Sequence, residues 1–284
     1  MERVCAAHTR GNLKVLRNTK KCIEIQPNFS LAHFNLGIIC SEMKMWKSAE
    51  EEYRRALELN PHNGKAYQNL GRLYDMQGDI HKAICAYEEA IENNPCFKAA
   101  HNNLGGFYAR AGRYDEAINE FRKAVRIDPH YVRGYSNLGK MHLVQGNASG
   151  ALEAFQHALS IDPKNLWARY YLGRLYIMMS RYGEGISAYE EVIDDHPNFF
   201  PAYIDLARIL GEKGIDVDRA LKLAQKAVEL RPTAQTFDLL AWLYFRRGMY
   251  EDAEKAIERA VGLDPSNESI IRHREEIRRR MGYR

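Results

Sequence analysis

The sequence has few of the features that mark a metal site, a disulfide framework or a membrane anchor. Its five cysteines stand singly and form no Cys-x-x-Cys pair, which argues against zinc and disulfides and favours a reducing compartment. No apolar run approaches the roughly 18–20 residues that cross a bilayer, and the first residues lack the apolar core of a signal peptide. We therefore expect a cytoplasmic protein without a transmembrane segment.

The sequence also lacks a strong charge of either sign and any catalytic motif. Lys and Arg number 41 against 37 Asp and Glu, a net charge of +4 over 284 residues, which gives no electrostatic reason to expect a nucleic-acid partner. There is no His-Glu-x-x-His sequence, no Walker loop and no Gly-x-Ser-x-Gly elbow. We expect no catalytic residue, no metal and no cofactor, and hence a protein that is not an enzyme.

Proline is sparse, yet eight of the nine prolines recur at a nearly fixed interval. They are separated by five intervals of 34 residues, then by 35 and 33: Pro27, Pro61, Pro95, Pro129, Pro163, Pro197, Pro232 and Pro265. Within each interval, apolar residues follow the i, i+3, i+4 spacing of two helices, and no stretch shows the alternation of a strand. The sequence therefore predicts an all-α protein of repeated helix pairs.

Small residues recur at fixed places in these helix pairs. The first helix of five pairs contains an internal glycine: Gly37, Gly71, Gly105, Gly139 and Gly173. Glycine in a helix costs about 1 kcal/mol relative to alanine. The second helix repeats alanines, such as Ala117 and Ala124, around an aromatic residue such as Phe121. The glycines are explained if a neighbouring helix packs closely against each of them.

The pattern Leu-Gly-x-x-Tyr, Gly, Ala-x-x-x-Phe/Tyr-x-x-Ala, Pro resembles the tetratricopeptide repeat (TPR) family. The resemblance implies a right-handed α-solenoid of helix-turn-helix repeats. We predict a partial repeat at 1–27, a basic capping helix at 266–284, and seven repeats at 28–61, 62–95, 96–129, 130–163, 164–197, 198–232 and 233–265. Residues 1–10 supply only part of a first helix, so the chain either has a degenerate cap or is cut from a longer protein.

Asparagine recurs on the side of the repeats that the resemblance makes concave. In this family the first helix of each repeat lines that side, and the position before each Leu-Gly points inward. Four consecutive repeats carry asparagine there, and we call these residues the asparagine ladder: Asn35, Asn69, Asn103 and Asn137. The ladder is similar to that in the TPR part of the protein O-GlcNAc transferases. An amide can pair with a peptide backbone, but it can equally bond a neighbouring helix or water.

Basic side chains accompany the ladder. Three positions after a ladder position stand Arg72, Lys140, Arg174 and Arg208, and Tyr171 takes the ladder position of the fifth repeat. Together with the asparagines they form the predicted peptide-binding site, and their charge favours an acidic ligand. The alternative is a solvated face on which Asp75, Asp205 and Glu42 balance the charge.

Three functions are compatible with these observations. The leading hypothesis is a scaffold that binds an extended, acidic segment of another protein along its concave side. In the second, the repeats self-associate or dock into a larger complex. In the third, the chain is the targeting arm of an enzyme, for example of glycosyltransferase type, whose catalytic part lies elsewhere. The sequence identifies neither the partner, the pathway, the organism nor the oligomeric state, nor whether Met1 is the native start.

Overall fold

Helices are the only regular secondary structure in residues 15–282, the residues that the computed structural model describes. The contacts between residues divide the chain into two units, Met1–Asn147 and Ala148–Arg284. Residues 15–25 are helical, whereas the first-helix part of the predicted repeat at 1–27 lies outside the described residues.

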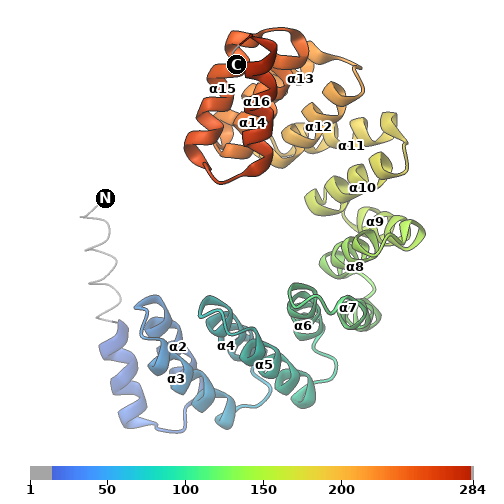
Figure 1. Ribbon diagram of the computed structural model, residues 1–284. Coiled ribbons are helices and arrows are strands. Elements are labelled where there is room, and N and C mark those ends of the chain that lie inside the picture. The colour runs from blue at the N-terminus through green and yellow to red at the C-terminus, as the bar shows by residue number, and fades with distance from the viewer. Residues whose placement is uncertain (1–14, 283–284) are drawn as a thin grey trace. The chain divides into compact units, whose positions relative to one another are not determined.

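The first unit consists of helix pairs joined by short turns, drawn from blue to green in Figure 1. Its first helices have 13 residues and its second helices 14, which matches the two apolar patterns in each interval. Their bounds are α2 Ser30–Glu42, α3 Trp46–Leu59, α4 Gly64–Met76, α5 Ile80–Asn93, α6 Lys98–Arg110, α7 Tyr114–Ile127 and α8 Val132–Val144.

The second unit repeats this arrangement and ends in a single helix. The bounds are α9 Ala148–Ile161, α10 Leu166–Met178, α11 Tyr182–Asp195, α12 Phe200–Glu212, α13 Val217–Leu230, α14 Ala234–Arg247, α15 Tyr250–Leu263 and α16 Glu268–Arg280. Helix α16 packs on α15 and α14 and buries Ile270 and Ile277, while its other side chains stay more exposed. The predicted all-α solenoid with a C-terminal capping helix is confirmed.

Close helix packing explains the internal glycines. A Cβ atom on Gly71 would lie 2.3 Å from Cε2 of Tyr87, and one on Gly105 would lie 2.8 Å from Cε1 of Phe121. Such distances are shorter than carbon atoms tolerate. The same conflict would arise between Gly37 and Tyr53. Only glycine therefore lets the aromatic ring of the second helix lie directly against the backbone of the first.

Two histidines at the same repeat position, His33 and His101, are buried and form polar links. His101 Nδ1 lies 2.6 Å from Oε2 of Glu120, and its Nε2 lies 3.0 Å from the carbonyl oxygen of Pro95. His33 makes the same two contacts, at 2.7 Å to Glu52 and 2.9 Å to the Pro27 carbonyl. Each histidine therefore ties a first helix both to its second helix and to the preceding proline loop.

First helices of successive repeats also contact one another, in the first unit at α2–α4 and α6–α8 and in the second at α12–α14 and α14–α16. Side chains at equivalent positions of these helices therefore come together on one face of each unit. Each unit has a hollow lined by its first helices.

Candidate functional site

The first unit has a hollow of about 510 Å³, which we call the N-terminal hollow. It lies on α4, α6 and α8, with one residue from α5. Its lining residues are Gln68, Asn69, Arg72, Asp75, Tyr87, Asn102, Asn103, Gly106, Phe107, Arg110, Arg133 and Asn137. Three of the four ladder asparagines and one of the four predicted basic residues are thus brought together, and Asn35 is not among them.

Asn103 lines this hollow and is held by a buried tyrosine. Its Nδ2 donates to the Tyr87 hydroxyl at 3.2 Å, and that hydroxyl donates to the Gln68 carbonyl oxygen at 3.3 Å. Burial raises the pKa of Tyr87 to about 12, although the hydrogen bond from Asn103 partly offsets the rise, so the phenol stays protonated at neutral pH. The second amide hydrogen of Asn103 remains available to a ligand.

Asn137 occupies the next ladder position but has Phe121 where Asn103 has Tyr87. Its Nδ2 instead donates to Oδ1 of Asn102 at 2.9 Å, and the Asn102 amide lies 3.5 Å from Oδ1 of Asn103. Asn102 is only 4% exposed, so it joins two ladder residues from below. Asn102 directly precedes Asn103 in the sequence, but its partner Asn137 lies 35 positions away, so no local sequence signal predicts this contact.

The charge of the N-terminal hollow is mixed but mainly positive. Arg110 forms an ion pair with Asp75, one of the acidic residues expected to balance the basic ones, and its guanidinium lies 5.5 Å from the centre of the Phe107 ring. Arg72 and Arg133 are exposed at the hollow, and neither forms an ion pair with a described residue. Three arginines therefore face a single carboxylate.

The remaining predicted residues lie elsewhere. Asn35 and Lys140 are exposed on α2 and α8, outside this lining, while Arg174 and Tyr171 lie on α10 of the second unit. The Tyr171 ring stacks on Trp167, with ring centres 5.9 Å apart. Phe199 packs edge-on against Trp167 with ring centres 5.4 Å apart, so the three rings form an aromatic cluster.

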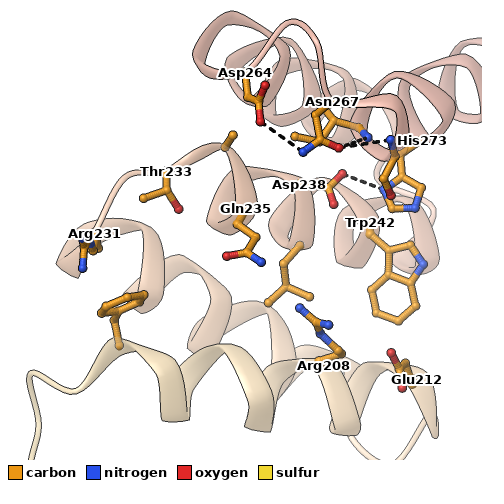
Figure 2. A pocket seen from close by; sticks show the side chains of 15 residues that line it. Arg208, Glu212, Arg231, Thr233, Gln235, Asp238, Trp242, Asp264, Asn267 and His273 are labelled. Atoms are coloured by element: carbon orange, nitrogen blue, oxygen red, sulfur yellow. Dashed lines mark hydrogen bonds and ion pairs between the residues drawn. The ribbon is translucent and has the colours of Figure 1, made fainter. Parts of the chain in front are cut away.

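A larger hollow of about 760 Å³ lies in the second unit, and we call it the C-terminal hollow. Figure 2 shows that its walls come from α12, α14 and α16. Arg208, the last of the predicted basic residues, rises from α12 into this space. On the opposite wall Nδ1 of His273 lies 2.7 Å from Oδ1 of Asp238, and the Asp238 carboxylate raises the pKa of His273.

Comparisons with known families agree along most of the chain. Four models described as tetratricopeptide repeat match residues 29–95, 69–132, 142–206 and 234–267. The chain belongs to the tetratricopeptide repeat family. A comparison with curated protein sequences found no significant match. TPR membership supports the role of a protein-interaction scaffold.

Solved TPR structures share the fold. MamA is 29% identical, with a TM-score of 0.50 over 57% of this chain and 94% of that one. A TPR protein from Parabacteroides merdae is 20% identical, with a TM-score of 0.67 over 87% and 98%. YrrB, described as a TPR protein with an unusual peptide-binding site, is 21% identical, with a TM-score of 0.52 over 65% and 95%.

The described part of the TPR chain contains neither a cluster of metal ligands nor a membrane-spanning helix. Between residues 15 and 282, no group of three or more His, Cys, Asp or Glu side chains is placed to hold a metal ion. Within the same range, no helix has the length and apolar character needed to cross a bilayer.

Proposed function

We propose that this TPR protein is a non-catalytic scaffold whose N-terminal hollow binds an extended, acidic segment of a partner protein. The observation that carries the proposal is the convergence of Asn69, Asn103 and Asn137 on a single hollow together with unpaired arginines. The amides would pair with the ligand backbone, and Arg72 and Arg133 would pair with its carboxylates.

The spacing of the helices supports an extended ligand. Packed helices lie about 8–10 Å apart, and an extended chain advances about 3.3–3.6 Å per residue. One asparagine on each successive first helix would therefore meet roughly every third residue of the ligand. Contacts to the backbone at this interval would hold the chain without reading its side chains, and the arginines would supply the preference for acidic sequences.

The internal hydrogen bonds of the ladder are compatible with this function. Tyr87 and Asn102 each use one group of a ladder amide, which fixes the orientation of that amide before the ligand arrives. Ordering a polar side chain in advance lowers the entropic cost of binding. These bonds therefore orient the amides and leave their other hydrogen-bonding groups for a ligand.

The test begins with a peptide selected from a random display library by the immobilised protein. We expect selected peptides rich in Asp and Glu, with an affinity that falls as salt rises, since exposed charges are screened. Arg72→Gln/Arg133→Gln should weaken binding and flatten the salt dependence, whereas Lys47→Gln on α3, outside the hollow, should change neither. Selection of peptides without acidic residues would contradict the charge assignment.

A further inference from the structure

The C-terminal hollow differs from the N-terminal one at equivalent repeat positions. Where Asn103 and Gly106 line the first, Leu239 and Trp242 line the second, four repeats further along the chain. The polar, backbone-pairing position is thus replaced by an apolar one, and an open glycine is replaced by an indole. The two hollows consequently present different chemistry to a ligand.

Trp242 is held in place by its surroundings. It packs against Gly211 of α12, where an added Cβ would lie 2.9 Å from Cζ3 of the indole. The Arg246 guanidinium lies 5.3 Å from the centre of the indole ring. Figure 2 shows the indole on the α14 wall, on the same side of the hollow as Glu212. A fixed, partly buried aromatic surface is suited to packing against a bulky apolar side chain.

Most carboxylates of this hollow already have partners. Asp238 faces His273, and Asp264 accepts hydrogen bonds from Asn267 and Ser266 at 3.2 Å each. Arg208, in contrast, is exposed and forms no ion pair with a described residue. Its side chain rises from α12 into the hollow, opposite the wall that carries Asp238 and His273 (Figure 2). Arg208 therefore offers a carboxylate its bidentate hydrogen bonds, beside the indole.

We propose that the C-terminal hollow is a second binding site, which takes a partner segment in which an Asp or Glu stands next to a bulky apolar residue. Arg208 binds the carboxylate and Trp242 packs against the apolar side chain. A purely acidic segment would leave the indole uncovered, and a purely apolar one would bury the Arg208 charge without a partner. This site does not depend on the peptide site proposed for the first unit.

The fluorescence of Trp242 can report whether a peptide occupies the C-terminal hollow. The chain has three tryptophans, so Trp46→Phe/Trp167→Phe leaves the one in the hollow. Capped peptides Gly-Gly-Glu-Phe-Gly-Gly, Gly-Gly-Gln-Phe-Gly-Gly and Gly-Gly-Glu-Ala-Gly-Gly are titrated to about 5 mM, a range suited to short ligands. We expect a saturable emission change with the Glu-Phe peptide and an affinity at least about tenfold lower for the other two, because each lacks one contact.

A comparison of two variants tests whether Arg208 binds the carboxylate of the peptide. Arg208→Gln should make the Glu-Phe and Gln-Phe peptides bind alike, whereas Lys222→Gln, which removes an exposed charge from α13 outside the hollow, should preserve the difference. Circular dichroism confirms that each variant is folded. The proposal is overturned if no peptide gives a saturable change, if all three respond equally, or if Arg208→Gln still discriminates Glu from Gln.

Discussion

Gly105 and Gly106 are neighbours in α6 that have opposite surroundings. A Cβ on Gly105 would lie 2.8 Å from the Phe121 ring and 3.1 Å from the Ala117 carbonyl oxygen, whereas one on Gly106 would meet nothing within 4 Å. We predict that Gly105→Ala destabilises the protein by about 1–3 kcal/mol through overpacking. Gly106→Ala should stabilise it by up to about 1 kcal/mol, because alanine favours the helix. Urea unfolding of the two variants tests this, and equal midpoints would contradict it.

The buried carboxylate of Glu120 makes part of the protein's stability depend on pH. Burial alone would raise its pKa, but the hydrogen bonds from His101 and Lys123 outweigh burial and hold the pKa below its usual value. Such a carboxylate stabilises the fold above its unfolded pKa of about 4.3, and the contribution is lost as pH falls through the folded pKa. Glu120→Gln should therefore be less stable than the parent at pH 7 and lose less stability between about pH 5 and 3.

The matched control for this experiment is Glu116→Gln on the same helix. Hydrogen bonds from Arg113 lower the pKa of Glu116 as well, but this carboxylate is exposed and water screens the pair. Glu116→Gln should therefore leave the pH dependence of the protein's stability almost unchanged. If urea midpoints between pH 3 and 7 respond equally to both substitutions, the buried contact between Glu120 and His101 is not the source of the acid sensitivity.

At the scale of the element, the capping helix is attached to its neighbour by a titratable link. His273 of α16 contacts Asp238 of α14, and this hydrogen bond raises the pKa of His273 although burial acts against it. Because the pKa of His273 is raised in the folded protein, the contact contributes its full stability below the unfolded pKa of about 6.5. This contribution is lost as the pH rises through the folded pKa. The attachment of α16 should therefore loosen in alkaline solution.

Hydrogen exchange of the α16 amides between pH 6 and 9, corrected for the intrinsic rate, measures this attachment. We predict that protection falls with rising pH in the parent protein and is low and constant in His273→Gln. His81→Gln, which changes an exposed histidine on α5, serves as the control and should behave like the parent. Protection of α16 that does not change with pH in the parent would show that the ion pair does not hold the cap.

The helices were predictable because their signals are local in the sequence. The 34-residue period, the apolar spacing and the glycines all act within one repeat. A single repeat of the sequence therefore predicts the helix pair and the close contact of Gly105 with Phe121. The lining of the hollow was only partly predictable. The pairs Arg110–Asp75 and Asn137–Asn102 join residues 35 positions apart, and their formation depends on the distance between repeats.

At the scale of the whole molecule, the predicted site is distributed over two units with different surfaces. The first unit gathers amides and arginines around Asn103, whereas the second gathers Arg208 and Trp242 at the C-terminal hollow and aromatic rings around Trp167. The sequence already indicates this difference, because the ladder asparagines end at Asn137 and Tyr171 takes the ladder position of the next repeat. Substitutions at the ladder position, from asparagine to Leu239, account for the difference.

The claim that the ladder binds a peptide backbone is tested most directly by calorimetry with the display-selected peptide and the variant Asn69→Ala/Asn103→Ala/Asn137→Ala. Three lost hydrogen bonds of about 1 kcal/mol each predict roughly a hundredfold weaker affinity. Asn119→Ala, an exposed asparagine of α7, should bind like the parent, and all variants should keep their helical circular dichroism. Unchanged affinity in the folded triple variant would contradict the assignment of these asparagines to the ligand.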